Sequence, residues 1–119
     1  MTGDLNDTVQ AATTQMLLGP PGSEINTPGF ERPDQGDPQR LWNLAPLMPA
    51  GKNYSRKFQG REELIDHILA SAALVKNLDA IRAEAVIDEP LPSISISPSE
   101  RRSDPHSDHA AIVASFSDL

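Results

Sequence analysis

The stretch LIDHILAS, from Leu64 to Ser71, has the period-two alternation that is typical of a β-strand. Asp66 lies among aliphatic side chains on one face of this strand, and His67 lies on the other. A half-buried carboxylate is costly unless a hydrogen bond or an opposite charge compensates it. We expect His109 to be this partner, because an Asp that holds a His serves structure and catalysis alike. The alternative is that Asp66 caps a nearby turn or faces solvent.

Further elements are expected on both sides of this strand. Residues 54–59 form a predicted strand that turns at 60–62 into the LIDHILAS strand as a hairpin. A helix is expected from Asp7 or Thr8 to about Leu18, because its apolar residues recur at helical spacing. Trp42 is interpreted as a packing anchor rather than a base-stacking platform, because leucines surround it. The remaining expectations are a strand at 80–87, a buried aliphatic strand at 110–116, and long loops at 19–40 and 88–107.

The length and the net charge of the chain limit which functions are possible. The 119 residues are predicted to form one domain, residues 1–119. The formal net charge of −7 gives no overall basic field that would attract nucleic acid, so a polyanion would have to be held locally. No cysteine is present, which excludes disulfides and thiolate metal sites. The sequence has neither a leader pattern nor an apolar run of membrane-spanning length, so we expect a cytoplasmic protein unless a leader has been lost with a missing N-terminal half.

Two more motifs accompany the central strand. Gly3-Asp4-Leu5-Asn6-Asp7 opens the chain, and Ser107-Asp108-His109 precedes the last apolar run. In this order and spacing, the three motifs resemble the C-terminal half of the endonuclease/exonuclease/phosphatase superfamily, the deoxyribonuclease-I-like phosphoesterases. Leu5 stands where the family usually has Phe. The resemblance implies an α+β fold, namely an incomplete C-terminal half of a two-sheet α/β sandwich.

The same residues suit the chemistry that the resemblance implies, which is magnesium-dependent hydrolysis of a phosphodiester or phosphomonoester. Asp4 can orient or deprotonate a water molecule, and Asn6 can donate a hydrogen bond to a phosphoryl oxygen. Asp108 offers the hard oxygen ligand that Mg²⁺, or alternatively Mn²⁺, prefers. His109, held by Asp66, is expected to stabilise the transition state or to act as an acid or base.

Cationic and other histidine side chains complete the candidate set. Arg56 and Arg61 are expected either to contact a substrate phosphate or to form a solvated hairpin edge. His67 and His106 are interpreted as packing or surface histidines. With three histidines and no cysteine, the sequence disfavours a zinc site.

The family's first half supplies an Asn, a metal-binding Glu and a second His that cannot be placed in this chain. Only Met1 and Thr2 precede Gly3, so the buried strand that should lead into this turn is expected to be missing. We therefore expect a fragment that is inactive by itself, with Asp7 or Asp104 as substitute metal ligands if it proves active.

Two other functions stay open. One is a small non-enzymatic interaction protein, and the other is a complementation partner of a separate N-terminal half. Nucleic acid, sugar phosphates and lipids are all candidate phosphate-ester substrates.

Overall fold

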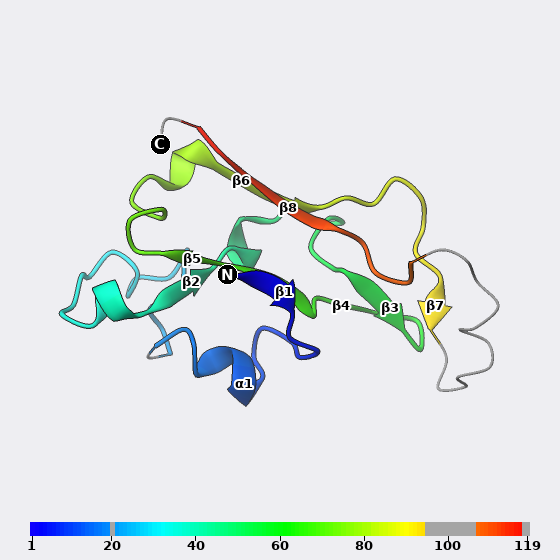
Figure 1. The fold of residues 1–119 in the computed structure, drawn as a ribbon, viewed down its shortest axis with the longest axis horizontal. Helices are drawn as coiled ribbons and strands as arrows, with labels where there is room; N and C mark the ends of the chain where they lie inside the picture. The colour runs from blue at the N-terminus through cyan, green and yellow to red at the C-terminus, as the bar shows by residue number, and fades with distance from the viewer. Residues whose placement is uncertain (20, 95–106, 118–119) are drawn as a thin grey trace.

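Strand β5 (Asp66–Ser71) lies at the centre of the computed structural model, which describes residues 1–19, 21–94 and 107–117 (Figure 1). Its two edges bind different strands in the order β1-β5-β2, and both partners run antiparallel to it. The alternation predicted from the sequence is confirmed, because His67 and Leu69 are buried while Asp66 and Ile68 are only partly buried. The flanking strands are β1 (Thr2–Asp4) and β2 (Leu41–Asn43).

Strand β1 is formed by the opening motif itself. Gly3 and Asp4 belong to β1 and pair with His67 and Asp66. All three residues of β1 are exposed, so this is an edge strand rather than the buried strand expected before the turn.

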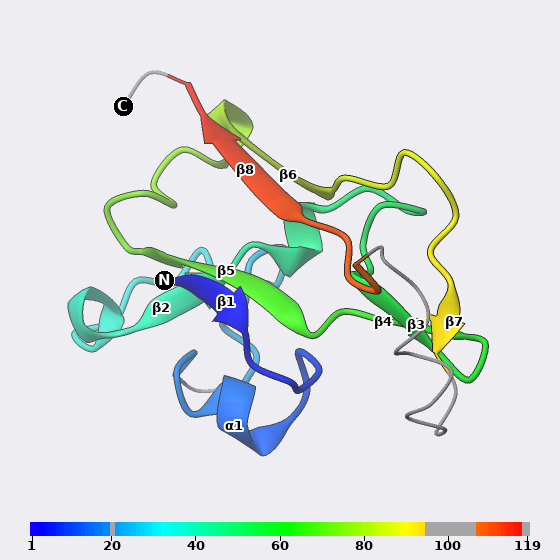
Figure 2. The same ribbon diagram turned by 45° about the vertical axis from the view of Figure 1, so that its right-hand side comes forward.

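A second layer covers β5 and β2. Figures 1 and 2 show β6 (Ile81–Ala85) and β8 (Ile112–Phe116) as an antiparallel pair on one side of the central sheet. Ile81, Ala83 and Ala85 are buried, as predicted for this strand. The main core lies between the layers and contains Ile25, Trp42, Leu44, Met48, Ala70, Val75, Ile81 and Ala83.

Strand β8 is less buried than its aliphatic sequence predicted. It pairs with β6 alone among the described strands, and Val113 on its outer face is 44% exposed. The opposite face, with Ile112, Ala114 and Phe116, is partly buried against the core. An antiparallel sheet commonly packs one face on the core and leaves the other face in solvent, which accounts for the difference.

The hairpin also differs from its prediction. Strand β3 (Arg56–Phe58) pairs with β4 (Arg61–Glu63), not with β5. The turn consists of Gln59 and Gly60, whose φ angles are 48° and 76°. Positive φ at both central residues is typical of the tightest hairpin turns. The chain therefore reverses at 59–60 instead of 60–62, and it reaches β5 only after β4. A short strand, β7 (Ser93–Ile94), adds to β3 in parallel within the segment that was predicted to be loop.

The predicted N-terminal helix shrinks to α1 (Ala12–Gln15). Three 3-10 turns are also described, namely η1 (Asp37–Gln39), η2 (Ala45–Leu47) and η3 (Leu78–Ala80). Segment 21–40 is otherwise made of turns and bends, as expected for a loop. The described structure is thus mostly β with few helices, which is compatible with the α+β class, and no helix in it has the length and apolarity needed to cross a membrane.

Trp42 is confirmed as a packing anchor. Its side chain is buried, makes an edge-to-face contact with Phe30 at a centroid distance of 6.4 Å, and lies under the guanidinium of Arg40 at 4.4 Å. These contacts use both the edge and the face of the indole ring, which leaves little surface for a stacked base.

Candidate functional site

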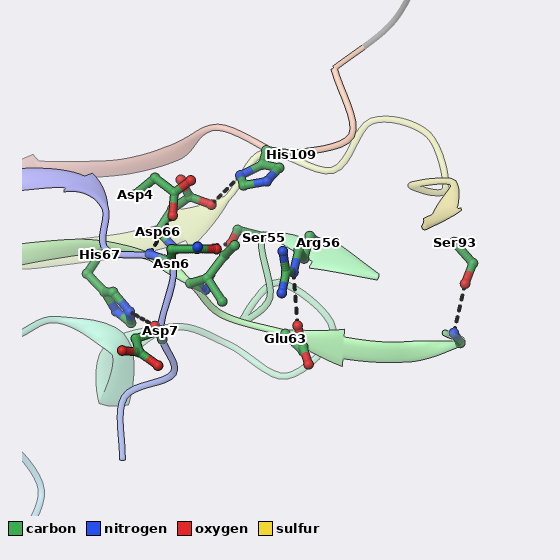
Figure 3. A network of polar contacts seen from close by, with 12 residues as sticks. Asp4, Asn6, Asp7, Ser55, Arg56, Glu63, Asp66, His67, Ser93 and His109 are labelled. Atoms are coloured by element: carbon green, nitrogen blue, oxygen red, sulfur yellow. Dashed lines mark hydrogen bonds and ion pairs between the residues drawn. The ribbon is translucent and has the colours of Figure 1, made fainter. Parts of the chain in front are cut away.

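Three of the predicted site residues converge at one end of the central sheet. Asp4 on β1 is paired in register with Asp66 on β5, and His109 lies just before β8. One ligand atom from each of these side chains lies within 4.8 Å of the other two (Figure 3). Residues separated by about a hundred positions in the sequence thus form one cluster, which we call the Asp4–Asp66–His109 cluster.

The hydrogen bond between Asp66 and His109 that the sequence predicted is present. The distance from Nδ1 of His109 to Oδ2 of Asp66 is 2.8 Å, and the two side chains are 27% and 21% exposed. Because an ionised carboxylate can only accept hydrogen bonds, Nδ1 carries the proton and Nε2 is the ring nitrogen left for another partner. The backbone N–H of His109 donates to the hydroxyl of Ser107, which holds the start of this segment.

The turn after β1 holds Asp4 and Asn6 together. The N–H of Asn6 donates to Oδ1 of Asp4 at 2.7 Å, and Asn6 has a φ of 53°. Asn tolerates this left-handed conformation better than most residues, and Asp often accepts the amide two positions later. The N–H of Leu5 donates to the carbonyl of Ile65, so the turn stays attached to the strand that carries Asp66.

The cluster opens into a groove of about 500 Å³ between the central sheet and the segment that leads into β8. Asp66 and His109 line it, together with Thr2, Gly3, His67, Ile68, Ser107, Ala110, Ala111 and Ile112. The paired Asp and His therefore face a space that is wide enough for a small ligand.

The other predicted site residues stand apart from this cluster. Asp108 is half-buried but does not belong to the group of ligand atoms, so its role as a metal ligand stays a prediction. Nε of Arg56 forms an ion pair with Glu63 at 2.9 Å, and its guanidinium lies over Phe58. Arg61 is exposed on β4. Asp104 and His106 lie outside the described residues.

His67 is a buried packing histidine, in agreement with its interpretation from the sequence. It is 3% exposed, and its Nδ1 lies 3.1 Å from Nδ2 of Asn43. Its Nε2 lies 2.8 Å from the carbonyl oxygen of Asp7. The carbonyl can only accept, so Nε2 donates to it and Nδ1 accepts from the Asn43 amide. His67 thereby attaches the turn that carries Asp4 and Asn6 to the core.

Ser55 was missed by the sequence reasoning. Its side chain is fully buried, and its hydroxyl oxygen accepts hydrogen bonds from the N–H groups of Ile65 and Asp66. Serine is common in exposed turns and loops, so the sequence carried no signal that this one would be buried at the start of β5.

Comparison with protein-family models, with curated proteins and with solved structures gave no match.

Proposed function

We propose that the chain acts on a phosphate ester in a divalent-cation-dependent reaction, with Asp66 and His109 as its acid–base pair. The observation that carries this proposal is the 2.8 Å hydrogen bond between these two side chains at the wall of an open groove. Asp66 fixes the ring orientation and holds a proton of His109 on Nδ1. Nε2 is then the atom that can exchange a proton with a water molecule or with the leaving oxygen of the ester.

The charges of the cluster explain why a cation would be needed. Asp4 and Asp66 place two carboxylates where a phosphate anion would approach, and the charge of Arg56 is already matched by Glu63. Mg²⁺ typically takes one or two carboxylates and keeps several waters, so the oxygen atoms of Asp4 and Asp66 fit it, and Mn²⁺ accepts the same donors. When bound, the ion would neutralise charge on the phosphoryl oxygens.

The substrate that fits best is a compact phosphate ester. A net charge of −7 opposes the approach of a long polyanion, whereas a single phosphate group needs only local neutralisation. The metal-ligand role of Asp108 and the phosphate contacts of Arg56 and Arg61 are not needed for this proposal.

Binding of inorganic phosphate, measured by calorimetry with Mg²⁺ and with a chelator, tests the proposal. Binding rather than turnover is the readout, because the resemblance implies that further ligands complete the site in this family. We expect Mg²⁺ to tighten phosphate binding roughly tenfold or more, and Asp4→Asn and Asp66→Asn each to abolish this gain. Asp34→Asn, an equal charge change in the exposed loop before η1, is the control and should keep the gain. Equal phosphate affinity with Mg²⁺ and with chelator would contradict the proposal.

A further inference from the structure

Ser55 lies where the segments that carry Asp66 and His109 meet. Its hydroxyl oxygen is 3.2 Å from the amide nitrogen of Asp66 and 3.2 Å from that of Ile65. Its carbonyl oxygen accepts a hydrogen bond from the N–H of Ala110, the residue after His109, at 2.7 Å. One buried residue is therefore bonded to the backbone on both sides of the Asp66–His109 pair, as Figure 3 shows for Ser55 and Asp66.

We propose that Ser55 is a positioning residue that sets the distance between Asp66 and His109. Asp66 lies on β5, whereas His109 lies in the segment before β8, 43 positions away in the sequence, so no local geometry fixes their separation. Ser55 links them through a short path: its hydroxyl holds the backbone of Asp66, and its carbonyl holds the backbone next to His109. Ser55 is not a lining residue of the groove, so its effect on a ligand must pass through the pair.

A hydrogen bond from the backbone N–H of Ser55 supports the same proposal. Its own N–H donates to the carbonyl of Glu63 at 2.9 Å, which holds the end of β4 beside it. Through its N–H and its hydroxyl, Ser55 is therefore bonded to the end of β4 and to the start of β5, where the chain leaves one sheet for another. Removing the hydroxyl would leave the N–H groups of Ile65, which is buried, and Asp66, which is partly buried, without this acceptor, and the start of β5 would shift to find another.

The test compares Ser55→Ala with Ser93→Ala, and the role it examines rests on the proposed function. Ser93 is a matched control, because its hydroxyl also accepts a backbone N–H, that of Gly60 at 2.7 Å, but it is exposed and lies on β7, away from the cluster. The first readout is the NMR signature of the His109 ring, which reports which ring nitrogen carries the proton. In Ser55→Ala we expect a mixture of the two tautomers, and faster hydrogen exchange at the Ala110 amide. In Ser93→Ala both should match the unmodified protein.

The second readout is the Mg²⁺-dependent gain in phosphate affinity, which should fall roughly tenfold in Ser55→Ala and stay unchanged in Ser93→Ala. If the unmodified protein shows no such gain, the proposed function fails, while the ring signature still decides the role of Ser55. A folded Ser55→Ala protein with an unchanged His109 ring and unchanged Ala110 exchange would overturn the inference. Should Ser55→Ala not fold, Ser55→Cys keeps the size with a weaker acceptor, and an unchanged ring signature there would overturn it equally.

Discussion

At the residue scale, two neighbouring side chains of one strand have separate tasks. Asp66 is partly exposed and holds His109 beside the groove, whereas His67 is buried and holds the turn after β1 through the carbonyl of Asp7. Successive side chains of a β-strand point to opposite faces, so Asp66 faces the site while His67, the next residue, faces the core. Asn43 completes the second arrangement, because its Oδ1 accepts the N–H of Ala45 while its amide nitrogen faces His67.

We predict that His67→Phe lowers the free energy of unfolding by about 1–3 kcal/mol. Phe keeps a ring of similar breadth but leaves the Asp7 carbonyl and the Asn43 amide without their partner, and unpaired buried polar groups carry a cost of this size. Urea denaturation measures the change. His67→Gln, which retains one donor and one acceptor, should lose less. An equal loss in the two variants would mean that ring packing, and not hydrogen bonding, is what His67 contributes.

At the element scale, local hydrogen bonds decide where elements begin and end. The helix expected from Asp7 or Thr8 is reduced to α1, because nearby side chains form hydrogen bonds with backbone carbonyls of the residues before it. The Thr14 hydroxyl donates to the carbonyl of Thr8, and the Gln15 amide donates to that of Val9. Side chains of this kind compete with helical hydrogen bonds, and apolar periodicity does not register them.

The β3–β4 hairpin gives a prediction at the same scale. Gly60 has a φ of 76°, and a Cβ atom there would meet no neighbour within 4 Å, so the cost of Gly60→Ala comes from the backbone alone. We expect this variant to lose about 1 kcal/mol of stability in urea denaturation. Gly3→Ala is the matched control, because its Cβ also meets open space and its φ is not positive. Equal stability of the two variants would contradict the described turn.

At the scale of the whole molecule, the sequence predicted strands better than it predicted their partners. Alternation identified β5 and β6, aliphatic content identified β8, and the cost of a half-buried carboxylate suggested the Asp66–His109 pair. The pairing of β3 with β4 depends on a two-residue turn with positive φ, and the pairing of β7 with β3 joins segments that are far apart in the sequence. Neither the turn nor the long-range pairing produces a periodic pattern of apolar residues in the sequence. The position of Ser55 between two sheets is set by tertiary contacts for the same reason. The two-sheet deoxyribonuclease-I-like sandwich stays a prediction.

The central claim is that the carboxylates of Asp4 and Asp66, beside His109, hold a divalent cation. A titration with Mn²⁺ followed by ¹H–¹⁵N NMR tests it most directly. Paramagnetic Mn²⁺ broadens the signals of nuclei near its site. We predict that broadening begins at the amides of Asp4, Asp66 and His109, and that the double variant Asp4→Asn/Asp66→Asn abolishes it. Broadening that begins instead at the acidic loop around Asp34 and Asp37, or that persists at the cluster in the double variant, would contradict the account.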